Sequence, residues 1–291
     1  MEERLINYGG QAVIEGVLMR GRKTWAIAMR SPDGSIVTKS GLLGGVYKSN
    51  LSRIPFLRGL ILLWDSLGLG TRALTDSANM QTEQDEKLEG PALYVTLALT
   101  LSVAIGIFFL APAGVGWLTE HFLHWNPWWS NLMEGTIRLL FLVGYIRGIG
   151  YLPDIARVFG YHGAEHKTIN AYEAGAELTP AFVADYPVEH PRCGTAFLLT
   201  LMVLSLFFFT ILGPLPLTWR LISRVVMIPI LTGIAYEYLR WTADHINSPF
   251  VRSIIKPNLV LQHLTTREPD EKMLEVAIAA FQTMQTAEQA T

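Results

Sequence analysis

Two long runs without a charged residue constrain this chain more than any other feature of its sequence. Residues 90–119 and 193–219 contain no Asp, Glu, Lys or Arg, and their central parts, 93–110 and 197–212, are almost wholly apolar. A helix that crosses the hydrocarbon core of a bilayer needs about 20 consecutive apolar residues. Both runs therefore predict membrane-spanning helices.

Two further apolar runs, 132–152 and 221–241, carry a few charges each. A charge at the middle of a span costs roughly 2.5–3.5 kcal/mol on insertion scales, so it normally lies near an interface or faces other helices. The alternative is a large soluble core of buried helices, which is disfavoured because four segments approach spanning length. We predict an α-helical integral membrane protein of about four transmembrane helices, with a small N-terminal β element and amphipathic helices.

The charges within these two runs receive a specific interpretation. We expect Arg138, Arg224 and Glu237 to lie near the ends of their spans and to reach the interface by snorkelling. Arg147 with Glu237 or Arg240 is the expected pair of residues inside the bundle.

The distribution of basic residues predicts the orientation. Residues 1–89 contain eleven Lys or Arg, residues 90–137 contain none, and basic residues return between Arg147 and Arg192. Cytoplasmic loops are enriched in Lys and Arg, so both termini and residues 154–192 are expected in the cytoplasm. Four Trp residues in the expected outer connection are typical of an interfacial belt or, alternatively, of a partner site; they are Trp117, Trp125, Trp128 and Trp129.

The composition excludes several classes of protein. Half of the 291 residues are hydrophobic, only 16% are charged and the formal net charge is −2, so a nucleic-acid-binding role is not expected. A single cysteine, Cys193, excludes an internal disulfide framework and a Cys-rich zinc module. Residues 1–11 have no apolar core, so we expect no signal peptide.

Outside the expected spans, short β-type runs and amphipathic segments remain. Residues 24–30 and 35–39 flank a Ser-Pro-Asp-Gly turn and predict a hairpin, to which residues 12–19 add a possible third strand. We divide the chain into a cytoplasmic β element (1–50), an amphipathic helix with an acidic linker (51–90), a four-span membrane domain that includes the cytoplasmic segment 154–192 (91–243), and a cytoplasmic C-terminal tail with a helix (244–291).

One group of residues, in segment 161–167, has the side chains and the spacing of a metal site. His162 and His166 are one helical turn apart, so they share a face and can hold one zinc ion. Glu165 lies beside them, where it could take a proton from a water that the metal activates. This is the H-x-x-E-H order of inverzincin peptidases. A polar network without metal, or ordinary surface residues, are the alternatives.

A zinc site needs at least one more protein ligand. His190 and Cys193, just before the third span, are the first candidates, and further ones are Glu173, Glu237 and His245. If His162, His166, His190 and Cys193 all bind the ion, the site is a closed tetrahedron and a structural role is favoured over catalysis. Cys193 as a free thiol at the membrane boundary is the alternative.

Four motifs give the chain a resemblance to a known family. They are residues 9–17 with 19–21, residues 161–167, residues 190–195 and residues 264–269. Together they closely resemble the YqhQ-like bacterial membrane proteins, a family of unknown function described in general terms as predicted metal-dependent enzymes. The resemblance implies a bacterial cytoplasmic membrane protein and draws attention to Glu15. This residue is a candidate ligand or base, or alternatively a carboxylate at a strand edge in a Gly-rich turn.

Two functions from different classes follow. The first is a metal-dependent hydrolase for a peptide or lipid-linked substrate, with Glu165 as base and Arg192 or Lys167 stabilising negative charge. The second is a non-enzymatic scaffold or accessory subunit of another membrane protein complex, favoured by the Gly144-x-x-x-Gly148 spacing that suits helix packing. A transporter is a weaker alternative because no internal repeat is visible. The expected partners are the lipid bilayer and, in the second case, another membrane protein.

Overall fold

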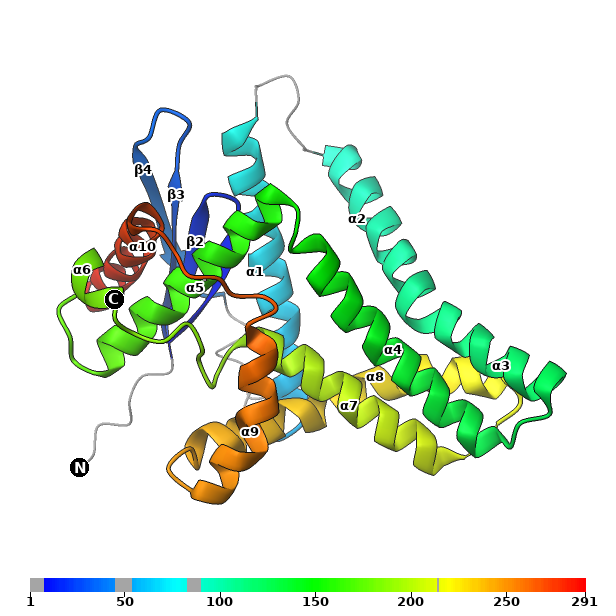
Figure 1. The fold of residues 1–291 in the computed structure, drawn as a ribbon. Helices are drawn as coiled ribbons and strands as arrows, with labels where there is room; N and C mark the ends of the chain where they lie inside the picture. The colour runs from blue at the N-terminus through cyan, green and yellow to red at the C-terminus, as the bar shows by residue number, and fades with distance from the viewer. Residues whose placement is uncertain (1–7, 45–53, 83–89, 214) are drawn as a thin grey trace.

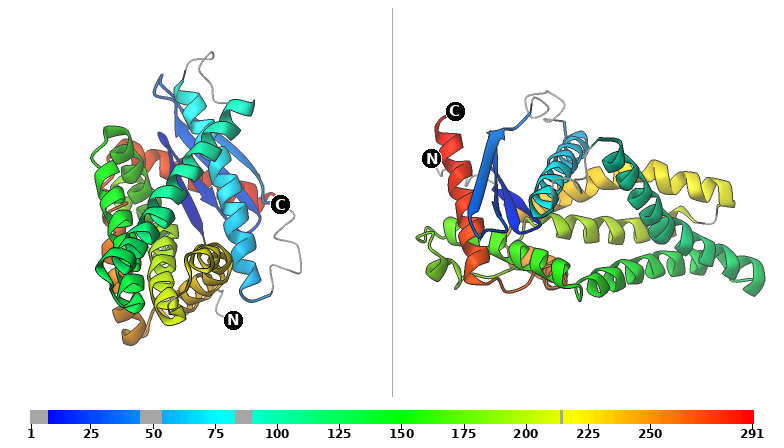
Figure 2. Two further views of the ribbon diagram at one scale, coloured as in Figure 1. Left: turned by 90° about the vertical axis from the view of Figure 1, so that its right-hand side faces the viewer. Right: turned by 90° about the horizontal axis from the view of Figure 1, so that it is seen from above.

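The computed structural model of the protein describes residues 8–44, 54–82, 90–213 and 215–291. Two parts are visible in Figure 1 and Figure 2: a small sheet with its covering helices at one end, and a group of long apolar helices that extends away from it. We call the first the sheet unit and the second the apolar bundle. Two shorter helices, α6 (Pro180–Val183) and α9 (Pro249–Gln262), complete the described part of the chain.

The sheet is an antiparallel meander of four strands in the order of the sequence. They are β1 (Gly9–Val13), β2 (Gly16–Arg20), β3 (Thr24–Arg30) and β4 (Ile36–Leu42). The predicted hairpin is present, with Gly34 at a φ of 89° in its turn. The prediction of one strand over residues 12–19 is wrong, because a two-residue turn of Ile14 and Glu15 divides it. Such tight hairpin turns require positive φ, and Glu15 has a φ of 51°.

Helices cover both faces of the sheet. Alternate residues of β2 and β3, such as Met19 and Ala28, pack on α5 (Pro153–Glu173) and α10 (Glu271–Gln289). The residues between them, such as Leu18 and Ile27, pack on the other side with Ala73 of α1 (Leu57–Gln81). A strand buried on both faces loses the apolar–polar alternation of a half-exposed strand, which explains the near-continuous apolar sequence of β2 and β3.

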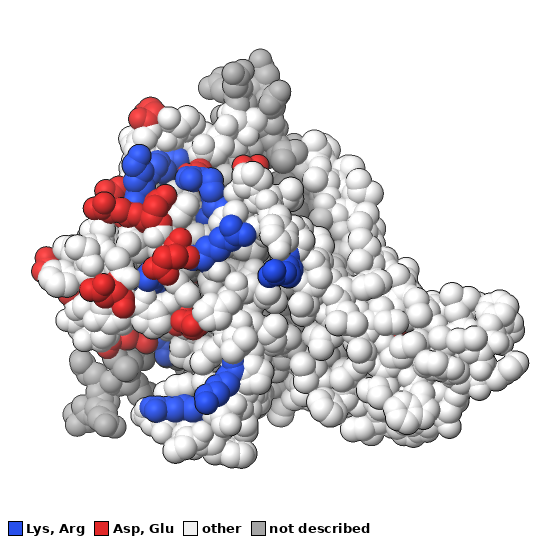
Figure 3. All heavy atoms as spheres, in the orientation of Figure 1, with Lys and Arg blue, Asp and Glu red and all other residues white. Residues whose placement is uncertain are grey.

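The apolar bundle contains the helices that were predicted to span a membrane. Its members are α2 (Gly90–Ile105), a π-helical turn η4 (Gly106–Leu110), α3 (Ala111–Leu123), α4 (Pro127–Ile149), α7 (Gly194–Leu212) and α8 (Leu217–Asp244). Among the described residues, three helical stretches are long and apolar enough to cross a membrane, namely Gly90–Leu123, Gly194–Leu212 and Thr218–Asp244, or up to four if the bent pair of α4 and α5 forms one span. That pair bends by 100°, at a break that Pro153 follows. On the face drawn in Figure 3, the charged side chains gather over the sheet unit and the bundle is nearly free of them.

The snorkelling interpretation is wrong for two of the arginines. Arg138 and Arg224 are only 1% and 3% exposed, and both bind the carboxylate of Glu134, which is 1% exposed. Arg138 donates to Glu134 at 2.8 Å, and Arg224 donates to both carboxylate oxygens at 3.0 and 2.9 Å. The guanidinium of Arg224 also lies 4.2 Å from the ring centre of Phe209. These three charges form a buried ion cluster between α4 and α8.

The predicted interior pair is also wrong. Glu237 accepts hydrogen bonds from the guanidinium of Arg58 and from the backbone N–H of Phe56, so it joins α8 to α1. The guanidinium of Arg147 instead lies over the ring of Tyr151, at 5.7 Å from its centre. The sequence shows which residues within the apolar runs are charged. Which of them pair across the bundle depends on which helices are neighbours.

The glycine spacing proposed for helix packing has no packing role within the described residues. A Cβ atom added at Gly144 or Gly148 would meet nothing within 4 Å outside its own helix. By contrast, a Cβ at Gly135 would lie 2.3 Å from a side-chain carbon of Leu206, so the close approach of α4 and α7 uses that glycine.

The expected orientation leads to a direct test with cysteine substitutions at two exposed positions. A membrane-impermeant maleimide applied to intact cells is expected to label Asn126→Cys, before α4, and to leave Glu177→Cys, after α5, unmodified. The native Cys193 is buried and serves as the background. The reverse labelling pattern would invert the topology, and labelling of both positions would contradict the number of spans.

Candidate metal centre

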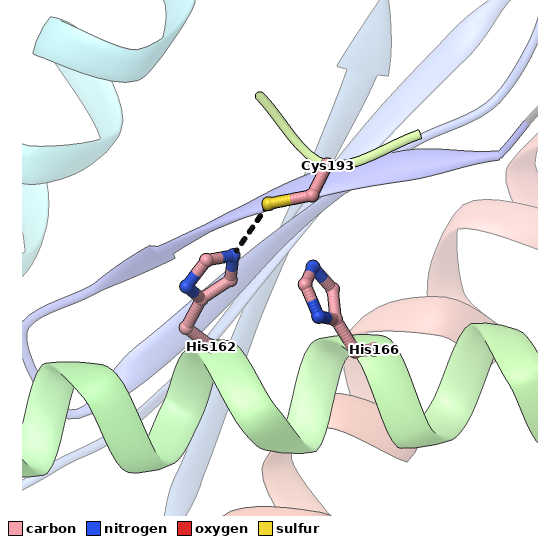
Figure 4. A group of neighbouring side chains, drawn as sticks. All are labelled: His162, His166 and Cys193. Carbon is pink, nitrogen blue, oxygen red and sulfur yellow. Dashed lines mark hydrogen bonds between the residues drawn. The ribbon is translucent and has the colours of Figure 1, made fainter. Parts of the chain in front are cut away.

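The helix α5 presents two histidines toward the start of α7. His162 and His166 lie on one face of α5, with ring centres 4.4 Å apart. Cys193 is the residue immediately before the first turn of α7, and its sulfur accepts a hydrogen bond from the backbone N–H of Thr195. One ligand atom from each of these three side chains lies within 4.8 Å of the others. Figure 4 shows both imidazoles directed toward the sulfur.

Backbone carbonyls orient both imidazoles. Nδ1 of His162 lies 2.8 Å from the carbonyl oxygen of Thr265, and Nδ1 of His166 lies 2.5 Å from that of Val188. A carbonyl only accepts, so in the neutral rings Nδ1 carries the proton and Nε2 keeps its lone pair. Nε2 of His162 is 3.3 Å from Sγ of Cys193. Metal-binding histidines show this arrangement, in which the second ring nitrogen donates to a backbone carbonyl.

Gly163 makes the first of these contacts possible. A Cβ atom at this position would lie 2.1 Å from the carbonyl oxygen of Arg267, so the segment that includes Thr265 can approach α5 only where a glycine stands. The residue was visible in the sequence between His162 and Glu165, but only the neighbouring segment explains its presence.

Glu165 is buried, and burial raises the pKa of its carboxyl group. The backbone N–H of Gly10 in β1 forms a hydrogen bond with it, while Oε2 has no partner among the described residues. A Cβ at Gly10 would lie 2.9 Å from this carboxylate, so β1 can come this close to Glu165 only because residue 10 is a glycine. His162 and His190 act in the opposite direction and lower this pKa, but burial has the larger effect.

His190 does not belong to the three-residue cluster. Its ring centre lies 5.7 Å from that of His166, and its Nε2 lies 3.7 Å from a carboxylate oxygen of Glu173 and 3.4 Å from the guanidinium of Arg192. Arg192 forms an ion pair with Glu173. His190, Glu173 and Arg192 thus form a separate polar group next to the cluster.

Gln262 of α9 holds the His190 segment in place. Its side chain accepts from the backbone N–H of His190 and donates to the carbonyl of the same residue, both at 2.9 Å. The segment before Cys193 is therefore tied to a helix more than 70 residues further along the chain. The sequence contained no signal for this contact.

Burial lowers the pKa of His190 to about 4, which predicts a pH dependence of stability. The unfolded chain binds a proton near pH 6.5, whereas the folded protein does so only near pH 4. The free energy of unfolding therefore falls as the pH drops through this window, by about 2 kcal/mol between pH 7 and pH 5. Denaturant titrations in EDTA are expected to show this loss in the wild type and a smaller one in His190→Gln. A matched change at the exposed His263 should leave the loss intact, and equal pH slopes for wild type and His190→Gln would contradict the prediction.

Three other candidates lie outside the cluster. The carboxylate of Glu15 accepts two hydrogen bonds from Arg157, at 2.5 and 2.6 Å, and one from the hydroxyl of Tyr161 at 3.1 Å. It clamps the β1–β2 turn to α5. Glu237 joins α8 to α1, and Nδ1 of His245 lies 2.9 Å from the carbonyl oxygen of Trp241 in its own helix.

The fold and the cluster define a mostly helical chain with candidate membrane spans, a small antiparallel sheet and a possible His/Cys site between them. The chain belongs to the family described as "Protein of unknown function (DUF1385)", whose model matches residues 54–287. It is 35% identical over 289 residues to "Uncharacterized protein YqhQ" of Bacillus subtilis (strain 168), which covers 94% of this chain and 91% of that protein. The family predicted from the motifs is confirmed. No solved structure matches the chain.

Proposed function

We propose that this protein is a membrane-inserted, zinc-dependent hydrolase whose metal is held by His162, His166 and Cys193. The observation that carries the proposal is the convergence of two oriented imidazole nitrogens on one thiol sulfur. Imidazole and thiolate are the ligands that Zn²⁺ takes most often in proteins, and three protein ligands leave one position open.

The chemistry of the surroundings fits a cation. Oε2 of Glu165 is buried and has no hydrogen-bond donor in the part of the chain that the structure describes, which is costly for a carboxylate unless a positive group or a proton compensates it. Zn²⁺ bound at the cluster would act as a Lewis acid and lower the pKa of a water molecule. Within the chain, Glu165 is the group placed to accept a proton, and Gly10 holds one of its oxygens in position.

The substrate class follows from the place of the cluster. Cys193 begins a candidate membrane span, whereas His162 and His166 belong to a helix of the sheet unit. A substrate that reaches this junction from the bilayer side is a lipid-linked molecule or a membrane-anchored peptide. Arg192, which is next to Cys193 in the chain and is paired with Glu173, is the proposed guanidinium for an anionic group of such a substrate.

A scaffold is the second candidate function. Two groups that could bind an anionic substrate are already neutralised, because Arg192 pairs with Glu173 and Lys167 pairs with Glu268. A metal held between α5 and the start of α7 would then tie the sheet unit to the bundle. In that case the site stabilises the protein and has no need of Glu165 as a base.

The metal proposal is tested by elemental analysis of the detergent-purified protein. We expect about one zinc per chain in the wild type and less than a tenth of that in His162→Ala/His166→Ala, because a single remaining thiol does not hold the ion. His245→Ala is the matched control, since the imidazole of His245 lies away from the cluster, against the carbonyl oxygen of Trp241 at the end of α8. Equal metal content in the double substitution and the wild type, or no metal in a folded wild type, would contradict the proposal.

A further inference from the structure

The outer face of α9 is apolar and has no partner within the described part of the chain. Its inner face packs against α7, and the residues buried there are Val251, Ile255 and Gln262. On the outer side Phe250, Ile254 and Val260 are 67%, 36% and 65% exposed. At 100° per residue these three side chains fall within an arc of about 120°. We call this set the α9 apolar arc.

Two basic residues border the arc on one side. Arg252 and Lys256 lie one turn apart, both are exposed, and α9 contains no Asp or Glu. Arg252 donates to the backbone carbonyl of Ile246 at 3.0 Å, and neither residue forms an ion pair with a described carboxylate. Basic side chains are visible over this region in Figure 3. An uncovered apolar arc beside unpaired cations is typical of helices that lie on anionic membranes.

The position of α9 along α7 agrees with a membrane interface. Asn258 donates to the hydroxyl of Thr200 at 3.3 Å, and Thr200 stands six residues after the start of α7 at Gly194. At 1.5 Å per residue, this contact lies about 9 Å along the candidate span. Interfacial helices bury their apolar face by about 5–10 Å at the boundary of headgroups and acyl chains. In Figure 1, α9 crosses the first turns of α7 and does not run along them.

We propose that α9 is an in-plane interfacial helix that binds anionic phospholipid of the cytoplasmic leaflet. The α9 apolar arc enters the acyl-chain boundary, while Arg252 and Lys256 bind headgroup phosphates. The neighbouring α7 exposes Leu198 on its own surface, so a lipid face continues past α9. The proposal rests on membrane insertion of the bundle and does not depend on the metal.

The depth of α9 is measured with a spin label at Phe250→Cys in the full-length protein reconstituted into phosphatidylcholine–phosphatidylglycerol nanodiscs. We expect the label to collide preferentially with oxygen, like a label at Leu198→Cys, and unlike one at the exposed Thr38→Cys of β4. The labelled wild type, with its buried Cys193, gives the background. A Phe250 label that behaves like the Thr38 label overturns the proposal while the Leu198 label still reports insertion. If the Leu198 label is also in water, the membrane assignment fails as well.

The headgroup contact is measured by native mass spectrometry of the same nanodisc preparations. Each basic residue near an anionic surface contributes about fivefold to binding, so Arg252→Gln/Lys256→Gln is expected to lower the preference for phosphatidylglycerol over phosphatidylcholine roughly 25-fold. Lys23→Gln/Lys272→Gln removes the same charge from exposed positions of the sheet unit and should change little. An unchanged preference in the α9 variant, or an equal loss in both variants, overturns the proposal.

Discussion

Replacing Glu134 by alanine is expected to destabilise the protein by about 3–5 kcal/mol. The substitution removes the one carboxylate that binds both Arg138 and Arg224, and it leaves two buried guanidinium groups without a counter-charge. Arg138 keeps one further acceptor, the backbone carbonyl of Phe108 in the π-helical turn, at 3.0 Å. The loss is measured by SDS titration of the protein in dodecylmaltoside micelles.

A matched substitution separates this electrostatic effect from a packing defect. Removing the whole cluster in Glu134→Leu/Arg138→Met/Arg224→Met leaves no unpaired charge, so most of the lost stability should return. The exposed Glu177→Ala should change the free energy of unfolding by less than about 0.5 kcal/mol. A cost below about 1 kcal/mol for Glu134→Ala would show that the two arginines find other partners or water.

Glu165→Gln is expected to abolish hydrolysis while zinc remains bound. The amide keeps the shape of the side chain and one accepting oxygen for the N–H of Gly10, but it cannot accept a proton. General-base assistance contributes roughly 10²–10⁴-fold to a rate, so the loss should lie in this range. The measurement is turnover of lipid-linked and peptide substrates in nanodiscs, together with zinc content and the unfolding midpoint.

The outcome for Glu165→Gln decides between the two proposed functions. Glu177→Gln, at an exposed position after α5, is the control for the change of charge. If the Glu165 variant retains zinc, stability and full turnover, the hydrolase proposal is wrong. If a strain that lacks the gene is fully complemented by this variant but not by His162→Ala/His166→Ala, a structural metal and the scaffold are favoured.

Local properties of the sequence determined the long helices and the pair of histidines. Hydropathy over about 20 residues identified the apolar helices, because burial in lipid acts on each segment separately. The spacing of His162 and His166 placed both imidazoles on one face, because the period of an α-helix is set by its backbone. The Ser-Pro-Asp-Gly turn likewise predicted the β3–β4 hairpin.

Only the tertiary structure decided which groups meet. Cys193 completes the cluster while His190, three residues away, faces Glu173 and Arg192. Arg138 of α4 and Arg224 of α8 do not reach the membrane surface. Both guanidinium groups bind the carboxylate of Glu134 in α4. The sequence shows which residues are charged and which can bind a metal. Their partners depend on the packing of helices that are distant in the sequence, 90 residues apart for Arg224 and Glu134 and 179 for Arg58 and Glu237. The cost of an unpaired buried charge then selects the pairing.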